Sequence, residues 1–178
     1  HIDGARIFNA AVYLEMSVAE LVKDADSVTF CLSKGLGAPI GSVLCGGHET
    51  VERGRRMRKM LGGAMRQVGV VAAAGIVALE TMVERLGDDH ANARRLAVGL
   101  SKIPGISIDP DSFPTNLVFF TVDTDRQSEL ARCLDERGVK VLPRSPRWRM
   151  VAHNDISTDD VDYALDVIDN TVRDFAIS

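Results

Sequence analysis

Two short β-type runs near the start of the chain constrain its fold more than any other feature. The first covers residues 1–3 and ends at Asp3, and the second covers residues 27–32 ("SVTFCL") and ends just before Lys34. Between them lie "ARIFNAAVYLE" and "SVAELVKDA", which have helical patterns. Because parallel strands need a crossover of this kind, we predict two neighbouring parallel strands joined by helices.

The second run leads into a glycine-rich loop, "SKGLGAPIG", and then into another β-type run, "GSVLCGG". We expect Gly35 and Gly37 to let the backbone pass a bulky ligand and turn sharply, and Pro39 to stiffen the loop. A lysine in such a loop is usually a solvated surface residue. The segment "GLGAPIG" also has some likeness to a phosphate-binding loop, although a helix should follow such a loop and here a β-type run follows.

Composition excludes several classes of protein. The net charge of -4 gives no support to nucleic-acid binding. Cys31, Cys45 and Cys133 lack the spacing of a metal site or a disulfide framework, which favours buried thiols in a reducing compartment such as the cytoplasm. The longest apolar run, residues 68–79, is too short to cross a membrane, so we expect no membrane partner. Its many small residues predict a helix that packs closely on other helices or on another subunit.

The order of patterns predicts two domains. Residues 48–61 are helical in composition, with Gly54 as a weak point, and we expect a long helix over residues 65–86 that Gly87 ends. From residue 104 onward, β-type runs alternate with amphipathic helices, as in an α+β layer with a largely antiparallel sheet. We therefore predict an α/β fold with one domain over residues 1–87 and a small α+β domain over residues 88–178.

Asp3, Arg6 and Lys34 form a candidate site. Neighbouring parallel strands lie about 4.8 Å apart, and ligands of α/β sheets bind beyond the carboxyl ends of the strands. Asp3 and Lys34 would therefore reach opposite ends of one small planar ligand. This pair suits pyridoxal phosphate, because a lysine amine forms a Schiff base with its aldehyde and a carboxylate keeps its ring nitrogen protonated. The planar guanidinium of Arg6 suits the cofactor's ring oxygen or a carboxylate.

Four segments give the chain a resemblance to a known family. The segments "HIDGARIFNAAV", "CLSKGLGAPIGSVLCG", "RRMRKMLGGAMRQVGVVAAAG" and "RMVAHNDIS" closely resemble the threonine aldolases, in the order that this family has them. These are pyridoxal-phosphate enzymes of the aspartate aminotransferase-like fold, also called fold type I. The resemblance implies that residues 1–87 belong to the large cofactor-binding domain and residues 88–178 to the small C-terminal domain.

The resemblance also implies an activity and a set of roles. The family cleaves threonine, allo-threonine and related β-hydroxy-α-amino acids to glycine and an aldehyde. By this resemblance Lys34 is the Schiff-base lysine, Asp3 the partner of the ring nitrogen, and Arg6 a cofactor contact. Arg149 matches the arginine that holds the substrate carboxylate. A further pair, Lys59 and Arg66, matches basic residues that approach the cofactor phosphate from a neighbouring subunit.

The resemblance implies partners as well. Family members are about twice as long as this chain, so we expect it to be the C-terminal part of a longer protein. The other half would supply a phosphate-binding glycine loop and a histidine that stacks on the cofactor ring. We expect a homo-oligomer, since the family is commonly a tetramer, an amino-acid substrate and no metal.

Three alternatives stay open at this point. Another pyridoxal-phosphate reaction on the same fold, such as β-elimination or transamination, would use the same lysine and aspartate. The chain could instead be a non-catalytic fragment that only packs against a partner. Arg53, Arg55 and Arg56 fit a solvated helix face as well as a binding role, and His153 fits a structural role as well as one in the site.

Overall fold

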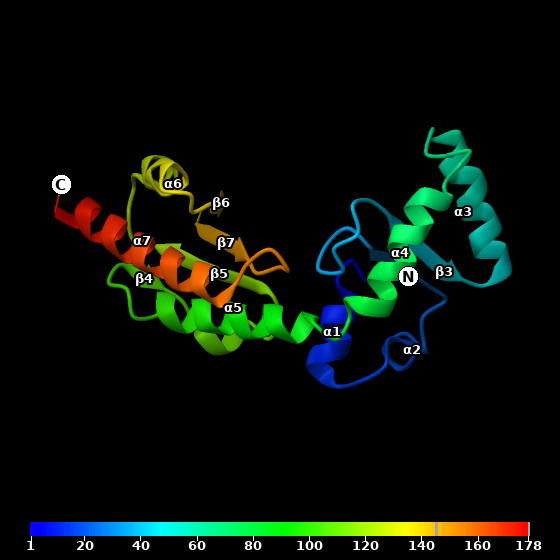
Figure 1. The fold of residues 1–178 in the computed structure, drawn as a ribbon, viewed down its shortest axis with the longest axis horizontal. Coiled ribbons are helices and arrows are strands. Elements are labelled where there is room, and N and C mark those ends of the chain that lie inside the picture. Colours follow the sequence, from blue (N-terminus) through cyan, green and yellow to red (C-terminus); the bar gives the residue numbers. More distant parts are fainter. Residues whose placement is uncertain (145, 178) are drawn as a thin grey trace. The chain divides into compact units, whose positions relative to one another are not determined.

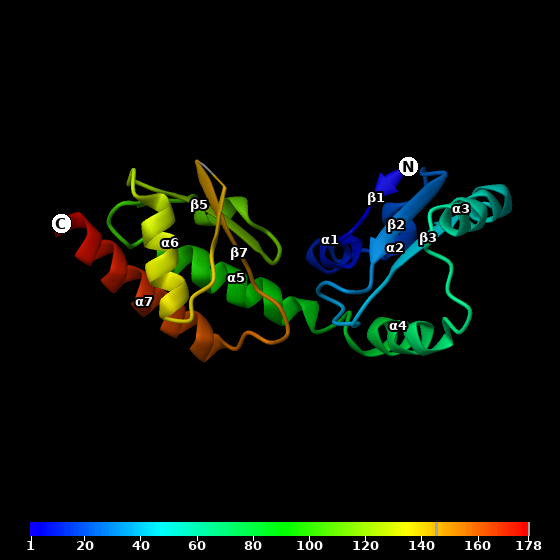
Figure 2. The ribbon, with the colours of Figure 1, turned by 90° about the horizontal axis from the view of Figure 1, so that it is seen from above.

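The computed structural model describes residues 1–144 and 146–177. The chain forms two compact units, residues 1–87 and 88–178 (Figures 1 and 2). Each unit contains a β-sheet with helices packed beside it, and the predicted α/β class is confirmed. None of the helices in the described part of the chain is long and apolar enough to span a membrane.

The first unit contains a three-stranded sheet in the order β1-β2-β3. Its strands are β1 (Ile2–Asp3), β2 (Ser27–Cys31) and β3 (Ser42–Gly46). Strand β1 pairs with β2 in parallel, and β3 returns antiparallel to β2. The crossover between β1 and β2 carries helices α1 (Ile7–Leu14) and α2 (Val18–Leu21). The prediction of two neighbouring parallel strands joined by helices is confirmed.

Alternating side chains of β2 anchor the core of this unit. Val28 and Phe30 are buried, and the Phe30 ring meets the Phe8 ring of α1 edge-on at 5.2 Å between centroids. Helix α1 contributes Ile7 and Ala11 to the same core. These contacts hold α1 against the sheet and so fix the direction in which the chain leaves β1.

Helix α3 (His48–Met60) runs through Gly54 without a break. A Cβ atom added at Gly54 would lie 2.7 Å from Leu44 Cδ2 of β3, which is closer than atoms can approach. The glycine therefore lets α3 pack directly on the edge strand. This close contact explains why a residue with poor helix propensity occupies the middle of the helix.

The predicted long helix over residues 65–86 is wrong. Helix α4 covers only Gly69–Thr81, and helix α5 (Leu86–Leu100) already begins at Leu86. Leu86 is fully buried in the core of the first unit, so the chain turns before it instead of continuing α4. Gly87 consequently lies in the first turn of α5 and ends no helix.

The second unit carries a four-stranded antiparallel sheet in the order β4-β5-β7-β6. Its strands are β4 (Ile106–Ser107), β5 (Leu117–Val122), β6 (Leu142–Arg144) and β7 (Arg147–Val151), and its further helices are α6 (Gln127–Glu136) and α7 (Thr158–Ile177). The antiparallel α+β layer predicted from residue 104 onward is confirmed.

The core of the second unit forms where these helices cover one face of the sheet. Val118, Phe120 and Val122 alternate along β5, and the fully buried Trp148 packs near Phe120, with 6.0 Å between ring centroids. The Trp148 Nε1–H donates a hydrogen bond to Gln127 Oε1 at 3.2 Å. The indole nitrogen is therefore satisfied inside the core, as a buried tryptophan requires.

Candidate active site

The carboxyl ends of β1 and β2 bring Asp3 and Lys34 to the same edge of the first sheet. Asp3 is the last residue of β1 and pairs with Thr29 in the middle of β2. Beyond it, the Gly4 N–H donates to the Thr29 carbonyl at 2.7 Å, so the two chains stay together at the strand end. Lys34 follows β2 in the next loop, and both side chains are exposed. The parallel pairing on which the predicted relation between Asp3 and Lys34 depends is therefore present.

A compact turn presents Lys34. The Gly37 N–H donates to the Lys34 carbonyl at 2.9 Å, and Gly37 has a φ of 74°, which favours glycine. At the ends of the loop, the Leu32 N–H donates to the Gly41 carbonyl at 2.9 Å, and Cys31 pairs with Ser42 across the strands. The sharp turn predicted at Gly37 is confirmed.

Gly35 has a different role from the one expected. Its position is buried, and the groups nearest to a Cβ atom added there are the side chains of Leu86 and Asn9. Gly35 therefore faces the interior of the protein. Close packing of the protein on itself explains this glycine, without any need for space beside a ligand.

Arg6 stands between Asp3 and helix α1. It is the N-cap residue of α1, its carbonyl accepts a hydrogen bond from the Ala10 N–H at 3.3 Å, and its side chain is half-buried. The stretch from Asp3 to Arg6 thus forms the connection between a strand end and a helix. In such a connection the backbone is held on both sides, which limits the positions that the guanidinium can reach.

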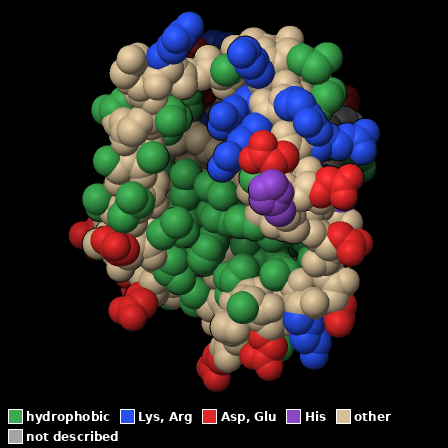
Figure 3. Space-filling model, turned by 90° about the vertical axis from the view of Figure 1, so that its right-hand side faces the viewer, with side chains coloured by type: hydrophobic (Ala, Val, Ile, Leu, Met, Phe, Trp, Pro, Cys, Tyr) green, Lys and Arg blue, Asp and Glu red, His purple; other side chains and the backbone are tan. Residues whose placement is uncertain are grey.

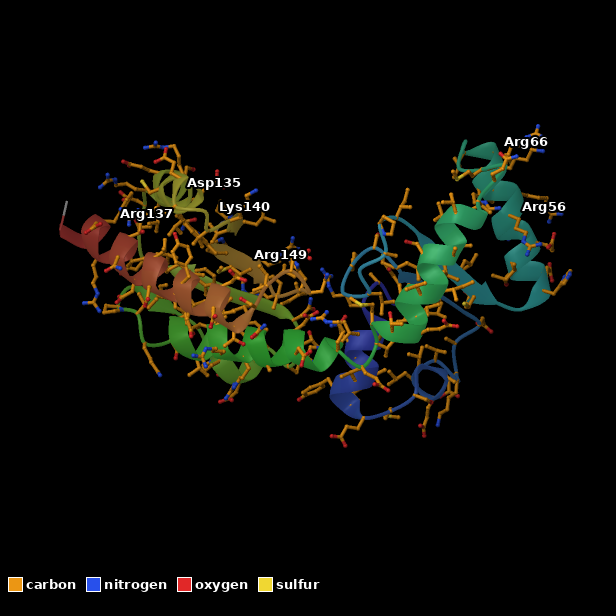
Figure 4. All side chains as sticks on the ribbon, viewed as in Figure 1. Arg56, Arg66, Asp135, Arg137, Lys140 and Arg149 are labelled. Carbon is orange, nitrogen blue, oxygen red and sulfur yellow. The ribbon has the colours of Figure 1, made fainter. Side chains whose placement is uncertain are left out.

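Arg149 belongs to the second unit, in the middle of β7 (Figure 4). It pairs with Phe119 of β5, and its neighbours Trp148 and Met150 point to the core side. Arg149 is therefore on the sheet face away from that core, where Arg147 also lies, with its guanidinium carbon 5.5 Å from the Phe119 ring centroid. Arg147 is not among the residues predicted for the site, although the alternation of side chains along a strand predicts this shared face.

Lys59 and Arg66 are exposed on and after the basic helix α3. Lys59 lies in its last turn, and Arg66 lies in the loop that leads to α4 (Figure 4). The solvated reading of Arg53, Arg55 and Arg56 agrees with their exposure, and Arg55 pairs with Glu52 at 3.0 Å.

Exposed apolar side chains accompany these basic residues. On the side of the molecule shown in Figure 3, apolar side chains line a hollow, and Lys and Arg side chains gather along one part of its edge. The large apolar side chains exposed on α3, on α4 and in the loop between them are Met57, Met60, Leu61, Met65, Val68, Val70, Ile76, Val77 and Leu79. Helix α4 buries only Gly75 and Ala78, and Gly75 packs on Leu32 of the lysine loop. Within this chain, α4 thus uses one narrow face to pack on the loop that carries Lys34.

His153 lies just after β7 and lines a cavity of about 390 Å³ in the second unit. Its Nδ1 accepts a hydrogen bond from the Asp155 N–H at 3.3 Å and lies 3.5 Å from the Asp155 carboxylate. These contacts shape the turn that enters α7, which favours the structural alternative for His153. Among residues 1–144 and 146–177, no cluster of histidine, cysteine and acidic side chains could hold a metal ion.

The groups at the edge of the first sheet suit a planar ligand with an aldehyde and a basic ring nitrogen. The carboxylate of Asp3 ends β1, the primary amine of Lys34 lies in the loop that follows the neighbouring parallel strand β2, and the guanidinium of Arg6 comes three residues after Asp3. An amine can bond covalently to an aldehyde, and a carboxylate can hold a proton on a ring nitrogen. The residues present therefore fit pyridoxal phosphate.

Proteins named threonine aldolases are similar to this chain in sequence. The chain is 44% identical over 169 residues to the low-specificity L-threonine aldolase 1 of Arabidopsis thaliana, covering 93% of this chain and 47% of the relative. It is 43% identical over 157 residues to the low-specificity L-threonine aldolase of Escherichia coli K12, covering 88% of this chain and 46% of the relative.

A solved structure shares the fold. A protein of Listeria monocytogenes described as an L-allo-threonine aldolase superposes with a TM-score of 0.76 at 19% identity, over 95% of this chain and 51% of its own. The chain spans about half the length of the relatives that it matches. The model of one family matches residues 1–123, which is the greater part of the chain and includes both strand ends of the candidate site. The chain belongs to the β-eliminating lyase family.

Proposed function

We propose that the whole protein is a pyridoxal-phosphate enzyme that cleaves L-threonine and L-allo-threonine to glycine and acetaldehyde by a retro-aldol reaction. The observation that carries this proposal is the parallel pairing of β1 with β2, which brings Asp3 and Lys34 to one sheet edge. The relatives named threonine aldolases, 43 to 44% identical over most of the chain, support this reaction. Such an enzyme would serve threonine breakdown and glycine formation.

In this proposal, pyridoxal phosphate supplies an electron sink for the carbanion that forms at the substrate's α-carbon. The Lys34 amine would hold the cofactor covalently through its aldehyde. The Asp3 carboxylate would keep a proton on the ring nitrogen, and Arg6 would bond to the ring oxygen or to a carboxylate. The exposed position of Lys34 supports its role, because the amine can reach a ligand beyond the strand end.

Arg149 is proposed to bind the substrate carboxylate. A guanidinium can bond to both carboxylate oxygens at once, which fixes the substrate and so the direction of the bond that breaks. Its place on the sheet face away from the packed core supports this role, because that face leaves the planar group accessible.

We propose further that the protein works as a homo-oligomer, a tetramer by its resemblance, in the cytoplasm. Lys59 and Arg66 would approach the phosphate of a cofactor bound in a neighbouring subunit. The exposed apolar side chains of α3, α4 and their loop support an interface there, because soluble proteins seldom leave so large a patch uncovered. The other half of the polypeptide would supply the phosphate-binding loop and the stacking histidine, and so complete each site.

The full-length protein with Lys34→Ala tests the proposal. The native protein is expected to show the visible absorbance of covalently held cofactor, and the variant is expected to lose it. If the variant keeps that absorbance unchanged, the role of Lys34 is wrong. The exposed lysine Lys23, substituted in the same way, serves as the control.

Product analysis then identifies the reaction. Glycine and acetaldehyde from threonine would establish the aldolase. The second candidate is a β-eliminating lyase, which the matching family model favours, and it would release ammonia and a keto acid instead. A full-length protein that binds cofactor and forms neither set of products would favour a non-catalytic role.

A further inference from the structure

The residue after Lys34 lies against two buried side chains. A Cβ atom added at Gly35 would lie 2.8 Å from Leu86 Cδ2 and 3.4 Å from Asn9 Oδ1. The φ of Gly35 is not in the positive region, so any residue could adopt its backbone conformation. An added methyl group would therefore meet the end of the Leu86 side chain, which would have to shift, and would touch the Asn9 amide.

Asn9 is an unusual neighbour for such a position. It is only 3% exposed, and it is the one polar side chain among the buried residues of α1. Burial of an amide costs free energy unless other groups bond to it, so a buried asparagine usually fixes a local structure. Its helix begins directly after Arg6 and packs on β2 through Phe8. Asn9 therefore lies in α1, the helix that follows the end of β1, where Asp3 is located.

The buried residues of this turn determine the position of Lys34, because they follow it directly in the chain. Leu36 and Ala38 are buried at 3% and 8% exposure, so the turn is held from below while Lys34 stays outside. Consecutive Cα atoms lie about 3.8 Å apart across a rigid planar peptide bond, so a shift at Gly35 moves Lys34 directly. The contact at Gly35 therefore fixes where the Lys34 side chain starts.

We propose that Asn9 is a positioning residue for Lys34. Its buried amide fixes how closely the turn packs on the core at Gly35. In this way it aligns the Lys34 amine with the carboxylate of Asp3. Helix α1 would then connect the two ends of the cofactor site, with Arg6 at its start and Asn9 one turn further on. This role depends on the proposed function, because it needs a cofactor that bonds to Lys34.

The test uses the full-length protein with Asn9→Ala, Asn9→Leu or Gly35→Ala. The cofactor is removed, pyridoxal phosphate is added back, and the rate at which the visible absorbance returns is measured together with its pH midpoint. We expect the rate to fall on the order of tenfold to a hundredfold and the midpoint to move, because small misplacements of a reacting group have effects of this size. Cofactor is still expected to attach in all three variants.

The matched control is Thr171→Val in the second unit. Thr171 is 1% exposed and bonds to Arg137 Nη1 at 2.9 Å, so its loss also removes a buried polar contact. This control is expected to lower the melting temperature and to leave the rate and the pH midpoint unchanged. A loss of stability without a change in these two quantities is what a purely structural residue would give.

The outcomes separate the two proposals. If the Asn9 variants lower only the melting temperature, as the control does, the positioning role is overturned and the proposed function stands. If native protein gains no visible absorbance, or Lys34→Ala keeps it, the proposed function fails and the positioning role fails with it. Where Asn9→Ala does not fold, Asn9→Leu removes the amide and keeps a side chain of similar size in the same place. Gly35→Ala also tests the contact from its other side.

Discussion

Asp3 pairs in parallel with Thr29, and the strand of Thr29 leads directly into the loop that carries Lys34. This pairing places the end of β1, which carries the Asp3 carboxylate, beside the strand that leads to the Lys34 amine. The first prediction concerns the carboxylate. In the full-length protein, Asp3→Asn is expected to lower the cleavage rate on the order of 10²- to 10³-fold, the usual effect of removing one electrostatic partner from a site.

Cofactor attachment to Lys34 is expected to survive in Asp3→Asn, since the amine is untouched. Steady-state kinetics and the visible absorbance measure the two effects separately. Asp24→Asn, another exposed carboxylate of the same unit, is the control and should change neither. An Asp3→Asn protein with native turnover would contradict the role given to this residue.

The second prediction compares two arginines on one sheet face. Arg149→Ala is expected to raise KM about 10- to 100-fold, because hydrogen bonds between charged groups contribute about 1.5–3 kcal/mol. Arg149→Lys should recover only part of this loss, since lysine lacks the planar pair of donors. Arg147→Ala removes the neighbouring arginine, which lies over Phe119, and should leave KM near the native value. The reverse order of effects would move the carboxylate site to Arg147.

The third prediction concerns the exposed apolar patch of the first unit. Leu61 is 81% exposed, and Leu61→Glu places a charge in the proposed interface. We expect the full-length variant to have a smaller mass in solution by light scattering, because burying an unpaired charge opposes association. Tyr163→Glu, at a position 57% exposed on α7, is the control. An unchanged mass in Leu61→Glu would place the interface elsewhere.

The fourth prediction concerns the start of α7. The Asp160 N–H donates to Ser157 Oγ at 3.1 Å, and the Ser157 N–H donates to the Asp160 carboxylate at 2.8 Å. Ser157→Ala removes one half of this reciprocal cap and should lower the free energy of unfolding by about 1 kcal/mol. Chemical denaturation measures the change. Ser128→Ala, at an exposed position in α6, should stay within about 0.5 kcal/mol of the native protein.

The fifth prediction concerns acid stability. The hydrogen bond from Arg95 to Asp162, followed by the charge of Arg95, lowers the pKa of the Asp162 carboxyl below its ordinary value of 3.8. A carboxyl with a lowered pKa in the folded state stabilises the protein above its unfolded pKa. That contribution is lost as the pH falls from about 3.8 through the lower, folded pKa. Asp162→Asn should therefore reduce the fall in stability over this acidic range.

Arg95→Gln should have the same effect on the acid dependence of unfolding, because it removes the partner of the same pair. The two groups form a double contact between α5 and α7, at 2.6 Å and 2.7 Å. In the double variant, the free energy of unfolding should fall by no more than the sum of its falls in the two single variants. The dependence of that free energy on acid pH should be the same in all three variants. Additive changes in acid dependence would show that the two residues act independently.

Local patterns predicted those parts of the fold that depend on neighbouring residues. The β-type run that ends before Lys34, and the helical crossover before it, were enough to predict the parallel pair. Helix α4 was predicted too long because its end depends on the burial of Leu86, which lies beyond the helix itself. No local pattern reveals that burial.

The residues of the candidate site also fall into those that the sequence could predict and those that it could not. Asp3, Arg6 and Lys34 could be chosen because their residue types and their places at strand ends indicate a chemistry. The position of Asn9 beside Gly35 could not be predicted, since the two residues lie in separate parts of the chain and Asn9 has no distinctive spacing. The shared face of Arg147 and Arg149 could have been found from the alternation of side chains along the strand.

The loop that carries Lys34 is closed at its base by the hydrogen bond between Leu32 and Gly41 and by the pairing of Cys31 with Ser42. Ordering a residue's backbone costs about 1–2 kcal/mol of conformational entropy. Because the base of the loop and its turn form as the chain folds, that loss belongs to folding and is absent from the later step of cofactor attachment. Cofactor affinity should accordingly change little when other parts of the chain loosen on heating. It should fall sharply once the loop between β2 and β3, which carries Lys34, loses these hydrogen bonds.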